Sequence, residues 1–406
     1  MPTLDEARRL ILAHTRTLGT ESVELIDSLN LVTAEGIIAP WDMPLCDNSA
    51  MDGYAVRTVD CTPAARLRIA GTITAGALSC APVEPGCAVK IMTGARIPAG
   101  ADAVVPFENA EMDGKYVAFK SPVQYHEHVR LAGSDLRRDE IVIPVGTVVR
   151  APEISMMASF SMSRVKVFRR PRVAILSTGD ELVEVGQPVV PGKVVDSNGI
   201  SLAAMVKECG AIVQMLGIAR DNVASHIEKM TSGLQADIFI TSAGVSVGER
   251  DLVRQVLTDL GVLLEFHSVD ARPGGPTTFG VKGNCLVFCL PGNPVASMII
   301  FAELVKPAIL KAVGYRRVLQ PAVRAILQEN ASKRPGRIKL LRVRLESNGD
   351  KLLAYSSGEQ TTGMLKTLLK ADGLAVLPAE SSLISAGEEV EVHVLSSNVL
   401  MQQEAI

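Results

Sequence analysis

Between residues 171 and 312, short apolar runs alternate with stretches in which apolar residues recur at helical spacing. The apolar runs are bounded by polar or small residues, as is typical of strands buried on both faces of a parallel sheet. The expected strands cover residues 172–177, 211–218, 237–241, 263–267 and 285–289, and the expected helices cover 199–209, 222–234, 251–260 and 294–312. This rhythm predicts a doubly wound α/β domain at residues 171–315, with right-handed crossovers.

The regions on either side have a different pattern. Residues 3–18 have the apolar spacing of an amphipathic helix. At about 45–145, Gly and Pro recur between short apolar alternations, which predicts a β-rich lobe inserted in an N-terminal region of residues 1–165. After Pro321 the short strands and turns return, and we expect a separate β domain at residues 320–400.

Composition restricts the class of protein. The 406 residues are 47% hydrophobic and 21% charged, with a net charge of −3, as in a soluble globular protein of several domains. Lys and Arg are spread along the chain, so we expect no nucleic-acid surface. We expect no membrane span and no signal peptide, and hence a cytoplasmic protein. The seven cysteines form no CxxC pair, which argues against structural zinc or disulfides.

The expected strand at residues 237–241 is followed by a loop rich in Gly and Ser, at residues 243–251. Gly244 and Gly248 allow the backbone to approach a ligand closely, Ser246 adds a hydroxyl, and Asp251 adds a carboxylate at the loop's end. Strand-to-helix turns in open α/β sheets bind anions through free backbone N–H groups. The alternative is a tight turn with a capping Asp.

Three further loops follow the strands that end near residues 177, 219 and 290, and all four loops can converge on one edge of the sheet. They would bring Glu181, Asp221 and Asp251 beside backbone N–H donors. Carboxylates next to an anion cradle indicate a bridging divalent cation, and oxygen ligands favour Mg²⁺. The alternative is three independent helix caps, and residues 196–199 are themselves best explained as a cap.

Six segments carry a resemblance to a known family. They are Asp47-Asn-Ser-Ala-Met-Asp-Gly-Tyr-Ala55, Met92-Thr-Gly-Ala95 with Gly100-Ala-Asp-Ala-Val104, Ser177-Thr-Gly-Asp-Glu-Leu182, Asp196-Ser-Asn-Gly199, Gly244-Val-Ser-Val-Gly248 with Asp251, and Pro291-Gly-Asn-Pro-Val295. These segments occur in the same order as in the family, and the match that they define extends over nearly the whole chain. The chain resembles the MoeA family of molybdopterin molybdenumtransferases, which includes the E domain of gephyrin.

The resemblance implies an N-terminal part with an inserted β lobe, a central molybdopterin-binding domain and a C-terminal β-barrel. It implies a homodimer whose active-site cleft is shared between the central domain of one subunit and the lobe of the other. The implied reaction inserts molybdenum from molybdate into adenylylated molybdopterin and is coupled to Mg²⁺-dependent release of AMP. A separate molybdopterin adenylyltransferase is the implied protein partner.

The resemblance also implies roles for particular residues. Asp52 and Thr93 match lobe positions that face the cleft, and Glu181, Asp221 and Asp251 match acidic positions that would hold the metal. Arg272 matches a basic catalytic position. The implied cofactor-binding positions are Ser177, Thr178, Gly179, Gly244, Ser246, Gly248, Pro291, Gly292, Asn293, Pro294, Arg337 and Thr362.

Four places depart from the family pattern. The family usually has Lys at Arg272 and a basic residue at Ser268, a charge that His267 could partly replace. This chain has Gly133-Ser-Asp135 where the family has Gly-Glu-Asp, and Ala243-Gly244 where the family has Gly-Gly. It has Gln360-Thr-Thr-Gly where Gln-Gly-Ser is more typical. These changes keep two alternatives open, which are a non-catalytic molybdopterin-binding or delivery protein and a variant that prefers tungstate.

Overall fold

The computed structural model describes residues 1–77, 81–242 and 252–395, and the chain divides into two compact units. The main unit comprises Met1–Ala34, Gly146–Ile154 and Ser163–Ile406, and the lobe unit comprises Glu35–Val145 and Ser155–Met162. The main unit contains an α/β domain and a β-barrel, and the lobe unit is built on a β-sheet.

The α/β domain is built on a six-stranded sheet with the order β16-β13-β17-β21-β20-β18. Its strands are β13 (Arg172–Thr178), β16 (Ile212–Ala219), β17 (Ile238–Ser242), β18 (Leu263–Phe266), β20 (Thr278–Lys282) and β21 (Cys285–Leu290). The first four in spatial order are parallel, and five of the six were expected from the sequence. The prediction omitted β20, which is antiparallel to both of its neighbours.

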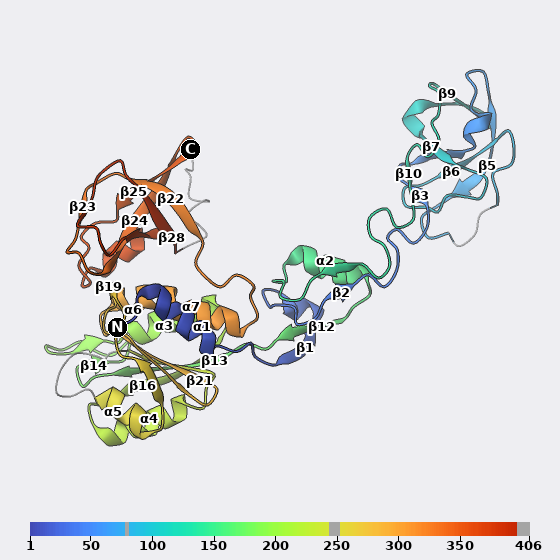
Figure 1. The fold of residues 1–406 in the computed structure, drawn as a ribbon. Coiled ribbons are helices and arrows are strands. Elements are labelled where there is room, and N and C mark those ends of the chain that lie inside the picture. Colours follow the sequence, from blue (N-terminus) through green and yellow to red (C-terminus); the bar gives the residue numbers. More distant parts are fainter. Residues whose placement is uncertain (78–80, 243–251, 396–406) are drawn as a thin grey trace. The chain divides into compact units, whose positions relative to one another are not determined.

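Helices cover both faces of this sheet (Figure 1). The bounds are α1 (Leu4–His14), α3 (Ser197–Glu208), α4 (Val223–Gly233), α5 (Leu252–Asp259), α6 (Pro294–Ile300) and α7 (Lys306–Ala312). One core joins α1, α3, α6 and α7 to one face, and a second core joins α4 and α5 to the other. Cys285 and Cys289, four residues apart on β21, both belong to the second core, because residues an even number apart on a strand share a face.

The stretch 294–312 is not one regular α-helix. A π-helical turn, η4 (Phe301–Val305), separates α6 from α7, and all five of its residues are buried. Single π turns inside helices frequently mark functional positions. One of its residues is the acidic Glu303, which is 1% exposed.

The C-terminal part of the main unit is a closed barrel of β24, β25, β22, β28 and β26, because β26 also pairs with β24. The bounds are β22 (Ala322–Leu327), β24 (Ile338–Asn348), β25 (Lys351–Ser356), β26 (Gly373–Leu377) and β28 (Glu389–Val394). The α/β domain contributes one short strand, β19 (Ala271–Arg272), which pairs parallel with β24. This pairing places Arg272 next to Lys339.

The lobe unit contains a six-stranded sheet with the order β7-β4-β6-β5-β9-β8. The bounds are β4 (Gly53–Val56), β5 (Leu67–Ile73), β6 (Cys87–Ile91), β7 (Ala103–Pro106), β8 (Ala110–Asp113) and β9 (Tyr116–Phe119). The β-rich lobe is thus as the sequence predicts. Its strand β4 lies between β7 and β6 and begins at Gly53, where a Cβ would lie 2.1 Å from the Val105 carbonyl oxygen.

Gly53→Ala should therefore destabilise the lobe unit by about 1–3 kcal/mol, because the added methyl group forces β4 away from β7. Trp41 is the chain's one tryptophan and belongs to this unit, so its fluorescence during urea unfolding reports on the lobe. Gly71→Ala on β5 is the matched control, since no atom lies within 4 Å of its Cβ position. Equal unfolding midpoints for the two variants would refute this packing argument.

The remaining elements are short. They are β1 (Thr20–Glu24), η1 (Leu25–Ser28), β2 (Ile37–Ile38), β3 (Asn48–Ser49), η2 (Thr58–Asp60), η3 (Phe107–Asn109), β10 (Val129–Arg130), β11 (Ile141–Ile143), α2 (Ala151–Ser159), β12 (Arg164–Phe168), β14 (Leu182–Val183), β15 (Val194–Val195), β23 (Ala331–Ser332), η5 (Leu365–Lys370) and β27 (Leu383–Ile384). Among the described residues, no helix combines the length and the apolar character needed to cross a bilayer.

Candidate functional site

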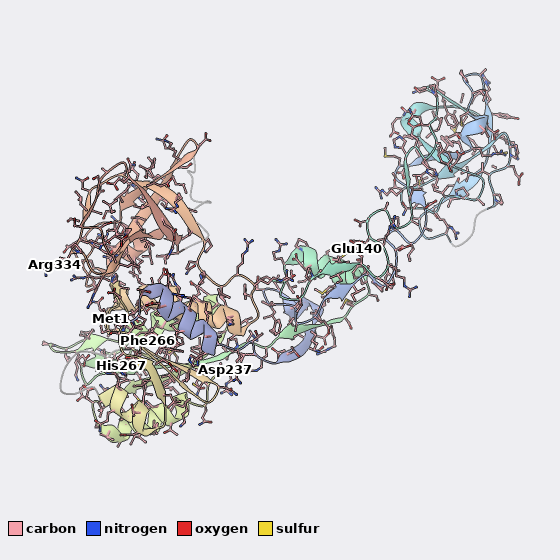
Figure 2. All side chains as sticks on the ribbon, viewed as in Figure 1. Met1, Glu140, Asp237, Phe266, His267 and Arg334 are labelled. Carbon is pink, nitrogen blue, oxygen red and sulfur yellow. The ribbon has the colours of Figure 1, made fainter. Side chains whose placement is uncertain are left out.

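The carboxyl ends of β13, β17 and β21 lie side by side. Ser177 is in register with Ser242, and Ser242 is in register with Leu290. Thr178 is paired in the same way with Ala219 at the end of β16. The loops that start after these residues therefore leave the sheet at one edge, as the sequence predicts. Asp237, labelled in Figure 2, precedes β17 and so belongs to the opposite edge.

Two of these loops are joined through Asp180 and Asp221. The Asp180 N–H donates to Asp221 Oδ2 at 3.3 Å, and the Asp221 N–H donates to Asp180 Oδ1 at 3.1 Å. The helix α4 is capped by Asn222 instead, whose side chain accepts from the Ser225 N–H. The capping interpretation therefore fails for Asp221, and its exposed carboxylate faces the loop after β13.

Glu181 folds back over the same loop. A Cβ at Gly179 would lie 2.5 Å from Glu181 Oε2, so the carboxylate occupies the space that only glycine leaves free. Gly179 also has φ +145°, which favours glycine. Arg220 holds the turn by donating to the carbonyl oxygens of Gly179, Asp180 and Leu182. The structure thus brings Glu181 and Asp221 to one edge of the sheet.

Asn198 connects two other loops at this edge. Its side-chain amide donates to Ser242 Oγ at 2.7 Å and to the Gly292 carbonyl oxygen at 2.8 Å. Asp196 caps α3 through the Gly199 N–H at 2.9 Å, which confirms the predicted cap. Pro294 occupies the first turn of α6, also as predicted. Asn198 was not among the predicted site residues, although the segment that contains it was noted.

Several buried oxygen atoms near these strand ends have no hydrogen-bond partner within the described part of the chain. They are Ser177 Oγ, Asn198 Oδ1, Thr241 Oγ1, Asn293 Oδ1 and Ser297 Oγ. A buried polar atom left without a partner costs about 1–3 kcal/mol. Hydroxyl groups can donate to phosphate oxygens, and amide oxygens can accept from the N–H groups of a pterin. This donor and acceptor set therefore fits a phosphorylated pterin.

The described acidic residues only partly form a metal site. Within the described ranges, no three His, Cys, Asp or Glu side chains gather around one point. Glu181 and Asp221 nevertheless provide oxygen donors at one edge, and Mg²⁺ is commonly bound by one or two carboxylates together with substrate phosphates. The two residues therefore fit Mg²⁺ bound jointly with a phosphorylated substrate.

Several predicted site residues lie outside the described residues. They are Gly244, Ser246, Gly248 and Asp251, together with Ala243, which departs from the family pattern. The other predicted cradle residues, Ser177, Thr178, Gly179 and the turn 291–294, all lie at the sheet edge described above. Thr178 Oγ1 donates to the Ser242 carbonyl oxygen at 3.4 Å.

A strongly basic cavity of about 350 Å³ lies where β19 meets the barrel. Five cationic residues line it, namely Arg272, Lys333, Arg334, Arg337 and Lys339, and its other lining residues are Pro335 and Gly336. Burial, followed by the charges of Arg272, Lys333 and Arg342, lowers the pKa of Lys339. Asp270 lies near the cavity, with its Oδ1 3.5 Å from Arg337 Nε. We call this cavity the basic pocket.

The basic pocket is linked to the loop edge through β20. Thr278, the first residue of β20, pairs with Cys289 near the carboxyl end of β21. The segment between Arg272 and Thr278 therefore starts at the basic pocket and ends at that edge. Arg272 and Arg337 were predicted as site residues, whereas Lys333, Arg334 and Lys339 were missed. The basic run around Arg337 is the sequence signal that points to them.

Two other predicted positions have different surroundings. Thr362 follows a loop held by the fully buried Arg342, which donates to the carbonyl oxygens of Glu359 at 3.0 Å and Thr361 at 3.1 Å. Thr362 is partly buried but does not line the basic pocket. His267, labelled in Figure 2, is exposed and does not line it either, so the pocket's charge comes from Arg272 and the cations of the C-terminal part and not from His267.

Asp52 and Thr93 lie together in the lobe unit. Asp52 Oδ1 accepts from the Thr93 N–H at 2.6 Å and from the Thr93 hydroxyl at 2.8 Å. The backbone N–H, followed by the hydroxyl, holds the pKa of Asp52 below its usual value. The family resemblance implies that both residues face the active-site cleft, and the structure pairs them directly at the surface of the lobe unit.

Thr93→Val should raise the pKa of Asp52 part of the way to its usual value, because the hydroxyl donor is lost while the N–H remains. An NMR titration of the Asp52 carboxyl carbon measures this change. Thr58→Val is the matched control, since the Thr58 hydroxyl donates to Asp102 at 3.0 Å in the same unit. An unchanged Asp52 pKa in Thr93→Val would contradict the assigned hydroxyl bond.

Comparisons with known proteins agree with this organisation. The model of the MoeA N-terminal region (domain I and II) matches residues 2–161, a probable molybdopterin binding domain matches 174–311, and the MoeA C-terminal region (domain IV) matches 324–395. A molybdopterin molybdenumtransferase of Haemophilus influenzae is 36% identical over 97% of this chain and 98% of its own length. The chain belongs to the MoeA family.

Other relatives extend the comparison over the whole MoeA-type fold. A molybdopterin molybdenumtransferase of Nostoc sp. is 36% identical over 92% of this chain and 88% of its own length. The crystal structure of a molybdopterin biosynthesis MoeA protein from Pyrococcus horikoshii superposes with a TM-score of 0.83 at 28% identity, and covers 97% of this chain and 100% of its own. The multidomain fold with a central α/β domain and a C-terminal barrel is thereby confirmed.

Proposed function

We propose that this chain is a molybdopterin molybdenumtransferase, which inserts molybdenum from molybdate into adenylylated molybdopterin with Mg²⁺-dependent release of AMP. The observation that carries the proposal is the basic pocket, which one short segment joins to a sheet edge lined with buried oxygens that have no hydrogen-bond partner among the described residues. Five clustered cations suit a small dianion such as molybdate. The names of the full-length relatives support the same reaction.

Each group of residues has a part in this proposal. Ser177, Asn198, Asn293 and the loop amides bind and orient the pterin and its phosphates. Glu181 and Asp221 hold Mg²⁺, which when bound neutralises charge on the phosphoanhydride that is cleaved. Arg272, Arg337 and Lys339 bind the molybdate dianion and hold it for transfer. Asp52 and Thr93 belong to the same active site in a homodimer, with the lobe supplied by the partner subunit.

The direct test is AMP release from adenylylated molybdopterin by the intact chain. We expect release that requires both molybdate and Mg²⁺, and a parallel reaction with tungstate measures which oxyanion is preferred. Binding of the pterin without any AMP release, under conditions in which a related enzyme is active, would instead support a delivery protein. Light scattering of the purified chain tests the proposed dimer.

The cellular setting follows from the same proposal. The substrate is an adenylylated pterin, so an adenylyltransferase must supply it, and we propose a cytoplasmic enzyme that receives its substrate from such a partner. Co-purification of the two proteins, with and without the pterin, measures whether the transfer is direct.

A further inference from the structure

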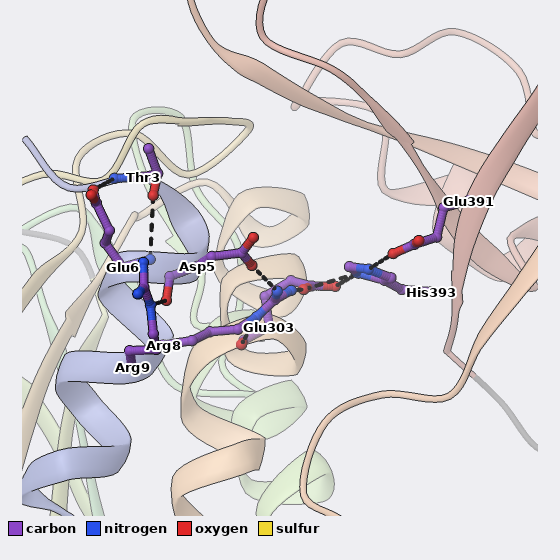
Figure 3. Close-up of polar contacts among 8 residues, drawn as sticks. All are labelled: Thr3, Asp5, Glu6, Arg8, Arg9, Glu303, Glu391 and His393. Atoms are coloured by element: carbon purple, nitrogen blue, oxygen red, sulfur yellow. Dashed lines mark hydrogen bonds and ion pairs between the residues drawn. The ribbon is translucent and has the colours of Figure 1, made fainter.

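A buried charge cluster lies between the α/β domain and the barrel (Figure 3). Its centre is Glu303, in the π-helical turn η4, with a side chain that is 0% exposed. Arg8 of α1 and His393 of β28 both contact the Glu303 carboxylate, and their side chains are 12% and 11% exposed. The cluster therefore ties together three segments that are far apart in the sequence.

The contacts are extensive for so few residues. Arg8 forms an ion pair with Glu303 through Nη2 and also donates from Nε to the Glu303 carbonyl oxygen at 3.2 Å. His393 Nδ1 lies 3.0 and 3.1 Å from the two carboxylate oxygens of Glu303. Its outer nitrogen, Nε2, lies 3.3 Å from Glu391 Oε1. Asp5 accepts from Arg8 Nη1 at 2.7 Å at the outer end of the cluster.

A carboxylate buried this deeply persists only when it is paired. The groups that face His393 are Glu303 from η4, Arg8 from α1 and Glu391 from its own strand. Burial disfavours the charged imidazole, but its hydrogen bond to Glu303 and the carboxylate charge outweigh burial and raise the pKa of His393. The pKa of Glu303 is lowered, because its contacts with His393 and Arg8 outweigh its burial.

The same two domains that this cluster joins also share the basic pocket. Arg272 comes from β19 of the α/β domain, whereas Lys339 and Arg337 come from the barrel. The β19–β24 pairing that aligns them is only two residues long. Such a short pairing cannot hold a barrel in place by itself, so its register depends on other contacts between the domains.

We propose that Arg8, Glu303 and His393 form a proton-dependent clamp that holds the barrel in the position where Lys339 and Arg337 face Arg272. They are positioning residues, since none of them lines the basic pocket. This inference rests on the proposed function, in which the basic pocket binds molybdate. It adds that the protonation of the clamp controls whether Lys339 and Arg337 are held next to Arg272 in that pocket.

The direction of the pH effect follows from the charge of His393. A histidine whose pKa is raised on folding strengthens the folded contacts below its ordinary pKa of about 6.5. That contribution is lost as the pH rises through the raised pKa. The clamp is therefore tightest in mildly acidic solution, and molybdate affinity should fall about threefold to tenfold as the pH rises past the pKa of His393.

The test compares wild type with His393→Gln at several pH values between about 6 and 9. Calorimetric titration with molybdate measures affinity, and hydrogen exchange measures protection of the β19–β24 pairing. In His393→Gln we expect the pH step to disappear and the affinity at low pH to fall to the high-pH value of wild type. Exchange should accelerate at residues 271–272 and 338–339 while the β13–β17 pairing keeps its protection. His14→Gln is the matched control, because His14 at the end of α1 pairs with Glu265 of β18 and not with a residue of the barrel.

An unchanged pH profile together with unchanged exchange in β19–β24 would overturn the clamp. If wild type binds no molybdate, the proposed function fails, and the exchange measurement still decides whether the clamp exists. Should His393→Gln fail to fold, Glu391→Gln replaces it, because Glu391 is half-exposed and contacts the outer imidazole nitrogen at 3.3 Å, with Arg324 as its other ion-pair partner at 3.8 Å. It should move the pH step to lower pH, and a step that stays in place would count against the clamp.

Discussion

Arg272→Ala should weaken the binding of molybdate to the intact chain by about 10- to 100-fold, because a charge-assisted contact to an oxyanion contributes about 1.5–3 kcal/mol. Arg272 lines the basic pocket from β19 together with four other cationic residues. Its loss removes a ligand and also widens the cavity. Titration calorimetry with molybdate provides the measurement.

Arg344→Ala is the control for general charge effects. Arg344 lies on β24 as Lys339 does, but it pairs with Glu346 and does not line the basic pocket. We expect its affinity to stay within about twofold of wild type. Arg272→Lys should retain part of the affinity, since the charge remains but the planar guanidinium donors are lost. Equal affinities for Arg272→Ala and Arg344→Ala would exclude the basic pocket as the oxyanion site.

Asp221→Asn should lower the Mg²⁺-dependent rate of AMP release by about 100-fold, since a neutral amide oxygen binds Mg²⁺ much more weakly than a carboxylate. The change is nearly isosteric, and an asparagine Oδ1 can still accept the hydrogen bond that Asp221 takes from the Asp180 N–H. The loop should therefore keep its conformation while the charge is lost. Glu181→Gln should act in the same direction, because Glu181 lies over Gly179 at the same edge.

Glu184→Gln is the matched control, as an exposed glutamate a few residues further along the same segment. Its rate should remain within about twofold of wild type. Titrating Mg²⁺ separates the two possible effects, because a lost ligand raises the metal concentration needed for half-maximal rate. A rate for Asp221→Asn close to that of Glu184→Gln would show that the metal site lies elsewhere.

Local sequence pattern was sufficient for much of the fold. The strands of the parallel part of the sheet are long apolar runs, and the cap at Asp196 and the proline at the start of α6 are local signals. The strand β20 was missed because Gly280 stands in its middle, a residue with low strand preference. The tertiary structure explains why this residue is glycine, since a Cβ at Gly280 would lie 2.7 Å from the Leu263 carbonyl oxygen.

The features that were missed depend on contacts between distant segments. The two-residue strand β19 has no periodicity to detect, so its pairing with β24 and the meeting of Arg272 with Lys339 could not be predicted. The π-helical turn η4 interrupts what the apolar spacing indicates as one helix, and it is associated with the buried contacts of Glu303 to Arg8 and His393. Asp221 resembled a helix cap because Asn222, the residue that caps α4, stands next to it.

The central claim is that this chain is a catalyst of molybdenum insertion, and a turnover count tests it most directly. The intact chain is mixed with an excess of adenylylated molybdopterin, molybdate and Mg²⁺, and the pterin-bound molybdenum is counted by mass spectrometry after separation from the protein. We predict many molybdenum-loaded pterins per chain, in proportion to the AMP released. At most one loaded pterin per chain, with no further increase in time, would contradict the claim.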